Sequence, residues 1–503
     1  MAKYLMGIDN GSTTIKAGVF DEKGNELGTA GVRCGTASPK PGWYERSTDD
    51  IWEANKKAIA EAIKNAGINA EEIVCISLTG HGNGAHLVDS NGNGVRNTIE
   101  GADLRAGEYA QRWQKDGTLQ KVHPKNMQAL WPALTLCVLA WLKDNEPETL
   151  EKTKWWLNVK DFVRMKLTGE AFLEYSDASG GGVINTRDRK IDGSIFADSG
   201  IEGLERLLPP LRYATEECGR ITKQAAAETG LSEGTPVAAG CYDIDTAALA
   251  SGVADDNYIN VIIGSWANNQ FVSKTPLVSE EFFSTTLFAI EGYYLMLEGS
   301  ATGAINFEWF LENIMAADVE LAKAQGRSIY EVCDKAMLDT PVDESEIVFL
   351  PFLYGSNTGN PDMRASFIGI EGWHKMRHVI RALYEGVAFT HRWHVERLEK
   401  HGKLPDAIRL AGGAARSEQW CALFADVLNR PVETTEATEL GTLGAAMCAA
   451  VCAGIYKDFK EAIKEMVHVR NRVEPNPKNA ELYSKKYSNY LRAIEALNAY
   501  WKR

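Results

Sequence analysis

The sequence lacks the short motifs that identify several classes of nucleotide and metal enzymes. It has no G-x-x-x-x-G-K-[ST] and no G-x-G-x-x-G that opens a helix. These absences exclude a Walker-type phosphate loop and leave a dinucleotide fold without support. There is also no HExxH and no cluster of cysteines and histidines. His391 and His394 lie on one predicted helix, where a packed helix face is a better interpretation than a ligand pair.

Long apolar runs, paired cysteines and excess positive charge are missing as well. The nine cysteines form no CxxC pair, so we expect free thiols in a reducing cytoplasm. No apolar stretch approaches the ~18 residues of a membrane span, and the chain runs directly into a strand, so we expect no signal peptide. The net charge of −14 argues against nucleic-acid and anionic-membrane partners.

The length and the order of elements predict an α/β protein with two domains. A chain of 503 residues exceeds the ~100–200 residues of one domain. Strands and helices alternate from the start, and residues 260–273 repeat the strand–turn–strand pattern of the opening. An internal duplication produces such an echo, although two hairpins also look alike by chance. We place the boundary near residue 250, which gives domains 1–250 and 251–503 that pack directly on each other.

The opening segment LMGIDNGSTTIKAGVFD, residues 5–21, is the most informative part of the chain. Two alternating strands joined by a glycine turn predict a hairpin. The turn carries hydroxyl and backbone N–H groups, which suit phosphate oxygens. Asp9 ends the first strand, where a carboxylate oxygen suits Mg²⁺ or its water shell. A strand–turn–strand phosphate loop indicates a class of ATP enzyme other than the Walker proteins.

Two further glycine-bearing elements lie in the second half of the chain. Gly264 and Ser265 form the second hairpin turn, and Gly412 and Gly413 end the strand of LAGGAARSEQW. Glycines at such positions let the backbone approach a flat or charged ligand closely. Each element alone is a plain tight turn more often than a site, but their joint order is much more specific.

Together these segments resemble the FGGY carbohydrate kinases, relatives of actin and hexokinase, over nearly the whole length. The matching segments include GIDNGSTTIKAGVFD, PGWYERSTDDIW, ASFIGIEGWHKMRHVIRALYEG, GGAARSEQW and GTLGAA, and GSWANNQF is similar to the L-xylulose kinase branch. The resemblance implies two actin-like (ribonuclease H-like) domains, each a mixed sheet flanked by helices, with an interdomain cleft. The chain departs from the family at Val138, where lysine is usual, and at His81-Gly82-Asn83-Gly84, where Gln-Met-His-Gly is usual. Both departures fall where the acceptor is recognised.

The resemblance implies that Asp243 is the general base. It follows the strand of TPVAAG and opens an alanine-rich helix, whose N-terminus favours the carboxylate form. Asp245 is the rival, but two positions in a first helical turn point about 200° apart. We therefore interpret Asp245 as the N-cap of a helix over residues 246–251, while an N-cap role for Asp243 also stays open.

The remaining roles are also carried over from the resemblance. Asp9 would hold the metal, and residues of both turns would bind ATP: Gly11, Ser12, Thr13, Lys16, Gly264 and Ser265. Adenine and ribose would lie between Gly303 and a group formed by Gly412, Gly413 and Ser417. The sugar candidates are His81, Asn83, Asp103 and the base itself, with Trp131, Trp266 or Tyr242 stacking on the sugar. Turn, cap and core positions are the alternative interpretations of these residues.

The resulting hypothesis is an ATP- and Mg²⁺-dependent kinase that phosphorylates a ketopentose hydroxyl, best matched by L-xylulose or D-xylulose. Erythritol, L-ribulose and 3-keto-L-gulonate stay open as acceptors, because single residue identities do not reveal pocket geometry. A non-sugar actin-like ATPase and a sugar-binding protein without catalysis are the other classes considered. A homodimer is the commonest prior for the oligomeric state, which the sequence does not reveal.

Overall fold

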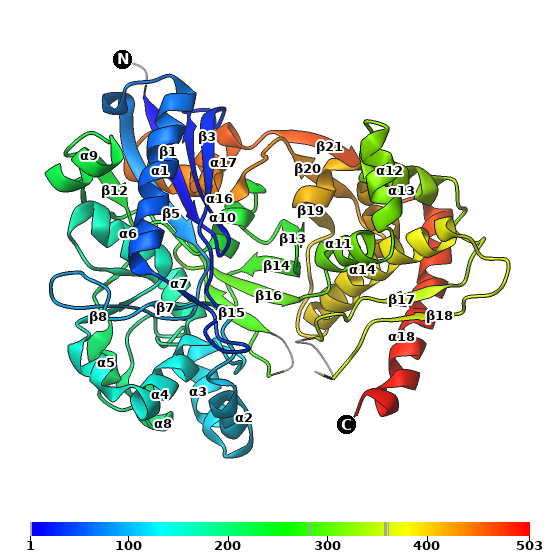
Figure 1. The fold of residues 1–503 in the computed structure, drawn as a ribbon, viewed down its shortest axis with the longest axis horizontal. Coiled ribbons are helices and arrows are strands. Elements are labelled where there is room, and N and C mark those ends of the chain that lie inside the picture. Colours follow the sequence, from blue (N-terminus) through cyan, green and yellow to red (C-terminus); the bar gives the residue numbers. More distant parts are fainter. Residues whose placement is uncertain (1–2, 281–282, 357–359, 361, 503) are drawn as a thin grey trace.

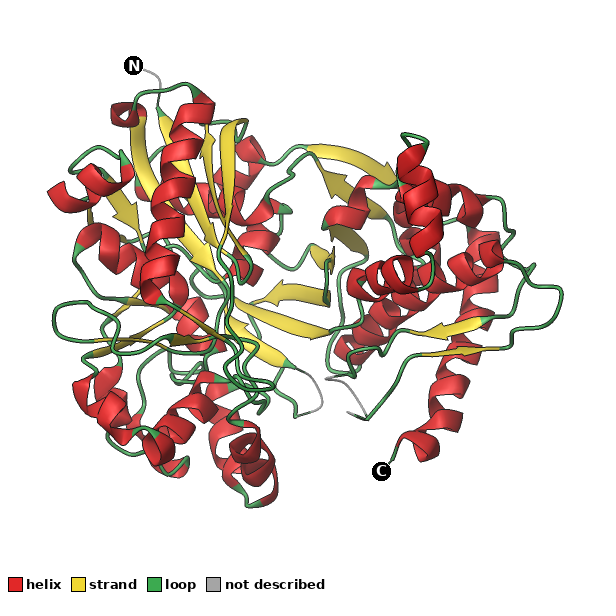
Figure 2. Cartoon of the chain, viewed as in Figure 1, coloured by secondary structure: helices red, strands yellow, loops and turns green. Residues whose placement is uncertain are grey.

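The computed structural model describes residues 3–280, 283–356, 360 and 362–502. Its strands gather in two large mixed sheets, one from each half of the sequence, with helices around both (Figure 1, Figure 2). The architecture is the α/β class that the sequence predicts. No described helix is both long and apolar enough to pass through a lipid bilayer.

The first sheet has six strands in the order β11-β12-β5-β1-β2-β3. The opening hairpin forms as predicted, because β1 pairs antiparallel with β2 and places Asp9 opposite Lys16. β1 also pairs parallel with β5, which pairs parallel with β12. The strands are β1 (Tyr4–Asn10), β2 (Thr14–Phe20), β3 (Glu26–Arg33), β5 (Ile73–Gly80), β11 (Glu217–Arg220) and β12 (Pro236–Ala238).

The second sheet has seven strands in the order β15-β16-β14-β13-β19-β20-β21. Its hairpin β13–β14 is antiparallel, and β13 pairs parallel with β19, which pairs parallel with β20. The strands are β13 (Tyr258–Ile263), β14 (Ala267–Ser273), β15 (Ser284–Leu287), β16 (Tyr294–Ser300), β19 (Ala407–Ala411), β20 (Val432–Thr435) and β21 (Val469–Val473).

The two sheets repeat one arrangement. In each, three strands run antiparallel (β1-β2-β3 and β13-β14-β16), two follow parallel to the first strand (β5-β12 and β19-β20), and one antiparallel strand closes the row (β11 and β21). The connection to the closing strand differs, because β11 precedes β12 in the chain while β21 follows β20. Six matching strand positions favour the internal duplication over a chance likeness of two hairpins.

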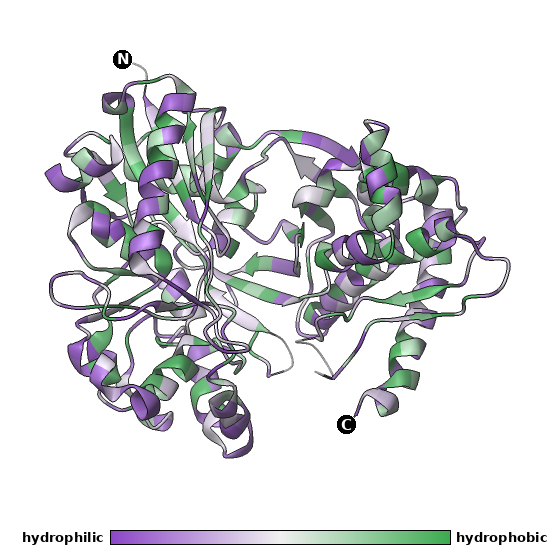
Figure 3. Cartoon of the chain, in the orientation of Figure 1, coloured by the Kyte–Doolittle hydropathy of each residue, from purple (hydrophilic) through white to green (hydrophobic). Residues whose placement is uncertain are grey.

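Helices cover the sheets, and α1 shows how sequence sets their ends. The Ser47 side chain accepts hydrogen bonds from the N–H groups of Asp49 and Asp50, and Gly67 ends the helix in the left-handed conformation, as N-cap and C-cap preferences predict. Hydrophilic residues follow its visible surface in Figure 3, with apolar residues in the strands behind. The longer helices are α1 (Thr48–Ala66), α2 (Gly107–Lys115), α3 (Thr118–Asn126), α4 (Thr135–Asn145), α6 (Val159–Thr168), α10 (Asp243–Ala250), α11 (Ala304–Asn313), α12 (Ala316–Ala324), α13 (Ile329–Leu338), α14 (Met376–Glu399), α15 (Glu418–Leu428), α16 (Leu440–Cys452), α17 (Phe459–Met466) and α18 (Pro477–Trp501).

Short elements fill the connections between these layers. The short helices are α5 (Pro147–Lys152), α7 (Tyr175–Gly180), α8 (Gly193–Asp198) and α9 (Lys223–Thr229). The short strands pair in twos and are β4 (Glu45–Arg46) with β7 (Thr98–Ile99), β6 (His86–Val88) with β8 (Trp155–Leu157), β9 (Leu173–Glu174) with β10 (Leu211–Arg212), and β17 (Val348–Leu350) with β18 (Ser366–Ile368).

Two helices, α10 and α16, join the halves of the molecule. Although α16 belongs to the second half, it packs on β1 and β5 of the first sheet and on α10 (Figure 1). Glycines allow this approach, because a Cβ on Gly7 would lie 1.8 Å from the Thr442 carbonyl oxygen and one on Gly444 would lie 2.3 Å from that of Thr246. A buried apolar cluster around both helices contains residues of both halves. The halves therefore pack directly on each other as expected, while a boundary at residue 250 stays a prediction.

Candidate active site

The site forms where three parallel strands of the first sheet end. The register pairs Asp9 of β1 with Thr79 of β5, and β12 runs alongside β5. Beyond β12 the chain leads into α10 at Asp243, and the Thr79 hydroxyl donates a 2.8 Å hydrogen bond to the Cys241 carbonyl oxygen in this connection. Because parallel strands end at one edge, Asp9, Asp243 and His81, which follows β5, gather there.

Two carboxyl groups at this edge have unusual proton affinities. Burial raises the pKa of Asp9 to about 6, against the opposing charge of Lys16. Burial raises the pKa of Asp243 to about 7, and the negative charge of Asp9 adds to this effect. The helix N-terminus was expected to favour the carboxylate form. Desolvation by burial is the larger effect on the pKa of Asp243, although the hydrogen bond from the Ile244 N–H at this helix start lowers that pKa. A carboxyl group with this pKa is well placed to take up a proton near neutral pH.

The structure separates Asp243 from its rival. The helix α10 begins at Asp243, and its N-cap is Tyr242, which makes no side-chain cap bond. Asp245 is fully buried inside the helix, and its Oδ1 accepts a 2.7 Å hydrogen bond from the Ala289 N–H group. The N-cap interpretations of both aspartates are therefore wrong. Asp243 is partly exposed at the site, so it is the member of the pair that a substrate can reach.

The predicted phosphate turn leaves its hydroxyl groups open. Ser12 and Thr13 are exposed, and Gly11 is half-buried between the strands of the hairpin. Lys16 lies further along β2, but its Nζ forms a 2.7 Å ion pair with Glu439, the residue before α16. Lys16 thus links the hairpin to the second half of the chain, and contact with phosphate would require this ion pair to open.

The second hairpin turn gathers the predicted glycines of the other half. The Ala304 N–H donates a 2.8 Å hydrogen bond to the Gly264 carbonyl oxygen. A Cβ on Gly303 would lie 2.4 Å from that same oxygen, and one on Gly412 would lie 2.4 Å from the Ile263 carbonyl oxygen. Glycine is therefore needed at both positions. Without it, the turn after β13, the start of α11 and the end of β19 could not meet. Ser265, at the tip of the turn, is exposed.

A small cavity of about 100 Å³ lies beside these glycines, at the ends of β19 and β20. Gly412 and Gly413 line it, whereas Ser417 does not; the Ser417 hydroxyl caps α15 and donates a 2.9 Å hydrogen bond to Asp334. The helix-cap interpretation of Ser417 thus describes its contacts better than the nucleotide one. The LAGGAARSEQW segment also contributes Leu410, Ala411, Ala415 and Arg416 to its lining. The remaining walls were missed, since β20 is too short to detect, and they are Thr434, Thr435, Glu436, Ala437, Thr438, Leu440 and Arg470.

The sugar candidates fall into two groups. His81 and Asn83 follow β5 directly, and Asn83 is buried with a left-handed φ of 68°. Asp103 differs, because it is fully buried and its two oxygens accept four hydrogen bonds from Tyr44 and Arg105. Four acceptor positions are all that a carboxylate has. The prediction that Asp103 binds the sugar is therefore wrong, and Asp103 instead holds two chain segments together.

Tyr242 lies between Asp243 and the loop that follows β5. A Cβ on Gly82 would lie 2.6 Å from its ring, and a Cβ on Gly180 would lie 2.8 Å from the opposite ring edge. The two glycines therefore hold the ring by close contact. Trp131 and Trp266, the other predicted stacking residues, approach each other through Phe283, with ring centroids at 5.8 Å and 6.4 Å from it.

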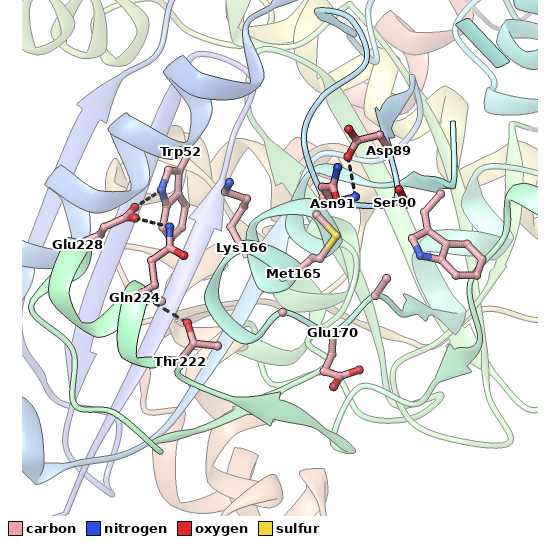
Figure 4. A pocket seen from close by; sticks show the side chains of 15 residues that line it. Trp52, Asp89, Ser90, Asn91, Met165, Lys166, Glu170, Thr222, Gln224 and Glu228 are labelled. Carbon is pink, nitrogen blue, oxygen red and sulfur yellow. Dashed lines mark hydrogen bonds between the residues drawn. The ribbon is translucent and has the colours of Figure 1, made fainter. Parts of the chain in front are cut away.

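The largest cavity described lies elsewhere and contains none of the predicted site residues. It measures about 500 Å³ and opens on the outer face of the first half, between α1, α6, α9 and the turn after β6 (Figure 4). Trp52 forms part of its wall and donates a 2.6 Å hydrogen bond to Glu228. Size alone therefore does not locate the reaction site in this protein.

Comparisons with known proteins agree with this geometry. The family model for the N-terminal domain of the FGGY family of carbohydrate kinases matches residues 4–250, and that for the C-terminal domain matches residues 259–453. The L-xylulose/3-keto-L-gulonate kinase of Escherichia coli strain K12 is 32% identical, over 100% of this chain and 99% of its own. The xylulose kinase of Bacillus subtilis strain 168 is 27% identical, over 97% and 96% of the two chains.

Solved structures support the predicted actin-like fold class. The xylulose kinase from Rhodospirillum rubrum superposes with a TM-score of 0.87 at 25% identity, with 100% of both chains covered. The glycerol kinase of Plasmodium falciparum with ADP has the same TM-score at 18% identity, over 98% of each chain. Two domain models that together span most of the sequence confirm the resemblance, and the chain belongs to the FGGY family of carbohydrate kinases.

Proposed function

We propose that this carbohydrate kinase transfers the γ-phosphoryl group of ATP to a hydroxyl group of a ketopentose, with L-xylulose or D-xylulose as substrate. The observation that carries the proposal is the pair Asp9 and Asp243 at one sheet edge, with the pKa of Asp243 raised to about 7. The names of the Escherichia coli and Bacillus subtilis relatives support the sugar class. ATP is the phosphoryl donor in carbohydrate kinases of this family.

Asp243 acts as the general base in this proposal. As the sugar oxygen attacks the γ-phosphorus, the hydroxyl proton passes to the Asp243 carboxylate. The new O–P bond forms while the bond between the γ-phosphorus and the bridging oxygen breaks, and ADP leaves with that oxygen. A positioned base contributes ~10²–10⁴ in rate, and alignment of the reacting groups supplies much of the rest.

The residues present fit a magnesium ion. Asp9 and Asp243 offer hard carboxylate oxygens, which Mg²⁺ prefers, and burial together with the charge of Asp9 raises the pKa of Asp243 to about 7. A bound cation would offset both the cost of burying the negative charge of Asp243 and the repulsion between Asp243 and Asp9. Asp9 would hold the ion, which neutralises charge on the transferred phosphoryl group. The open Ser12 and Thr13 hydroxyl groups and the Gly264–Ser265 turn would bind the phosphates from the two halves.

The substrate is tested by ADP release coupled to a dehydrogenase reaction. The screen covers L-xylulose, D-xylulose, L-ribulose, 3-keto-L-gulonate and erythritol, each with and without Mg²⁺. We expect the highest kcat/KM for one of the xyluloses and little ADP release without a sugar. Equal ADP release with every sugar and with none would indicate an ATPase and overturn the proposal.

One alternative acceptor has specific support. The Escherichia coli relative carries 3-keto-L-gulonate in its name beside L-xylulose. This sugar acid has a carboxylate that the ketopentoses lack, so a preference for it in the screen would replace the xyluloses as substrate. The proposed roles of Asp9 and Asp243 would then stay the same.

A further inference from the structure

A buried arginine connects the phosphate turn with the sugar loop. Arg46 of β4 is 1% exposed. Its Nη1 donates a 3.1 Å hydrogen bond to the Gly11 carbonyl oxygen, in the phosphate turn. Its Nη2 lies 2.6 Å from Nε2 of His81, the first residue after β5, and 2.8 Å from Oε2 of Glu100. One guanidinium group thus contacts both ends of the proposed site.

These contacts define the protonation of His81. A guanidinium group only donates hydrogen bonds, so a contact of 2.6 Å requires a free electron pair on the imidazole Nε2. The proton of the neutral ring therefore lies on Nδ1. Nδ1 lies 3.4 Å from the Gly82 carbonyl oxygen, which is longer than a good hydrogen bond. Nδ1–H is thus left with capacity to donate to a substrate oxygen.

The same cluster also has the ligand types of a metal site. One atom each of His81, His86 and Glu100 lie within 4.8 Å of one another. The Arg46 guanidinium, however, already contacts His81 Nε2 and Glu100 Oε2, two of the possible ligand atoms of this cluster. A second cation there would meet this positive charge at close range. The arginine therefore takes the place of a metal in this cluster.

We propose that Arg46 is a positioning residue for sugar binding: it holds His81 as the Nδ1–H tautomer and ties the sugar loop to the phosphate turn. The proposal rests on the proposed function, since it assigns Nδ1–H of His81 to an oxygen of the bound sugar. Glu100 completes the unit, because it balances the buried guanidinium charge and accepts a hydrogen bond from the Thr98 hydroxyl. Two loops that bind different substrates are thereby held in one rigid arrangement.

Loss of the guanidinium has a defined consequence for His81. Glu100 Oε2 also lies 3.2 Å from His81 Nε2, so without Arg46 the carboxylate becomes the only partner of that nitrogen. A carboxylate accepts hydrogen bonds, and the ring proton therefore moves to Nε2. Nδ1 then carries an electron pair towards the Gly82 carbonyl oxygen, where the two acceptors repel. We expect the loop of residues 81–84 to shift and sugar affinity to fall.

The test compares Arg46→Gln and Arg46→Lys with Arg96→Gln as a matched control. Arg96 is partly buried and pairs with Glu45 and Glu146, and none of its ion pairs or hydrogen bonds reaches His81 or Gly11. With the best sugar from the screen, Arg46→Gln is expected to raise the sugar KM at least tenfold and the MgATP KM less than threefold. Arg46→Lys should recover part of the loss, and Arg96→Gln should leave both constants within twofold of wild type.

Nitrogen NMR of histidine-labelled protein supplies a readout that folding defects do not imitate. The His81 signals are assigned by their loss in His81→Gln, and we expect Nδ1–H in wild type and Nε2–H in Arg46→Gln. An Nε2–H signal in wild type would overturn the proposal even if Arg46→Gln fails to fold. An unchanged sugar KM in a folded Arg46→Gln enzyme would do the same. If no sugar is turned over, the proposed function fails, while the tautomer still tests the role of Arg46.

Discussion

At the scale of single residues, Asp243 is the proposed general base. It begins α10 and is partly exposed, and its pKa is raised to about 7. Asp243→Asn keeps the shape of the side chain but cannot accept the proton, so we expect kcat to fall ~10²–10⁴-fold. ATP affinity, measured by calorimetry, should change less than threefold. A kcat for Asp243→Asn equal to that of the wild type would show that the base lies elsewhere.

The raised pKa of Asp243 also affects stability in a defined direction. The folded pKa of about 7 lies above the ~4 of an unfolded aspartate. The folded state therefore binds more protons between these values, and ionising Asp243 costs stability as the pH rises through this window. Asp243→Asn lacks this cost.

We accordingly expect the difference in melting temperature, Asp243→Asn minus wild type, to become more positive as the pH rises from 5 to 8. Differential scanning fluorimetry without nucleotide measures it. Asp21→Asn serves as a control, because Asp21 lies in an exposed turn away from the site. A constant difference between Asp243→Asn and wild type across this range would show that Asp243 is ordinarily ionised.

Asp9 should govern the magnesium requirement. Asp9→Ala removes the carboxylate that the strand end places beside Asp243, so we expect the Mg²⁺ concentration for half-maximal activity to rise at least tenfold. A magnesium titration at fixed ATP measures this shift. An unaltered titration curve with reduced kcat would remove Asp9 from the metal site.

Single residues also show where sequence reasoning ends. The position of Asp9 at the end of β1 was predictable, because a strand end and a glycine turn are local features, while its metal role stays a prediction. The saturation of Asp103 was not predictable, since three of its hydrogen bonds come from the neighbouring Arg105, whose side chain could equally have pointed elsewhere, and the fourth comes from Tyr44, 59 positions away in the chain. Asp245 failed for the same reason, because the Ala289 N–H that it binds is 44 positions away. A carboxylate that serves a distant backbone group has the same local sequence as one that serves a substrate.

At the scale of elements, α16 depends on the glycines beneath it. A Cβ on Gly7 would lie 1.8 Å from the Thr442 carbonyl oxygen, a backbone atom that moves only with the helix. Forced overpacking costs about 1–3 kcal/mol and occasionally more, so we expect Gly7→Ala to cost about 3 kcal/mol or more. The urea midpoint measures this change. Gly35→Ala is the control, since nothing lies within 4 Å of its Cβ position, and equal midpoints for the two variants would show that α16 is not seated on β1.

Elements with strong local patterns were predictable, and some of the short strands were not. The helices Thr48–Ala66 and Met376–Glu399 are of the detectable kind, because both carry long amphipathic patterns. β20 has only four residues, too few for a period to appear, whereas the three residues of β12 lie in the strand predicted from TPVAAG. The small cavity beside Gly412 and Gly413 lies at the end of β20, so its walls from β20 onward were missed with the strand.

At the scale of the whole molecule, the matching sheets account for the position of the site. β12 leads into α10 and β20 leads into α16, and these two helices contact each other between the sheets. The start of α10 carries Asp243, and Gly441 at the start of α16 lies so close to Asp9 that a Cβ there would be 2.3 Å from its Oδ2. The sequence echo of the two hairpins indicated duplication, but it did not reveal which helices meet.

The shared core of α10 and α16 predicts that the two halves unfold together. Buried residues from both halves form this cluster, among them Leu5, Cys75, Leu249, Leu295 and Met447. Neither half retains a covered surface here without the other, because α16 of the second half packs on β1 and β5 of the first. Separation would expose this apolar surface to water, at about 25 cal/mol per Å².

Calorimetry of the full chain is therefore expected to show one transition, with calorimetric and van't Hoff enthalpies that agree. A fragment of residues 1–252, made separately, should bind a dye for exposed apolar surface and aggregate. Adding residues 253–503 in trans should reduce dye binding if the fragments still fold against each other. Two resolved transitions, together with a soluble fragment that binds no dye, would show that each half closes its own core and that α16 adds little to the first sheet.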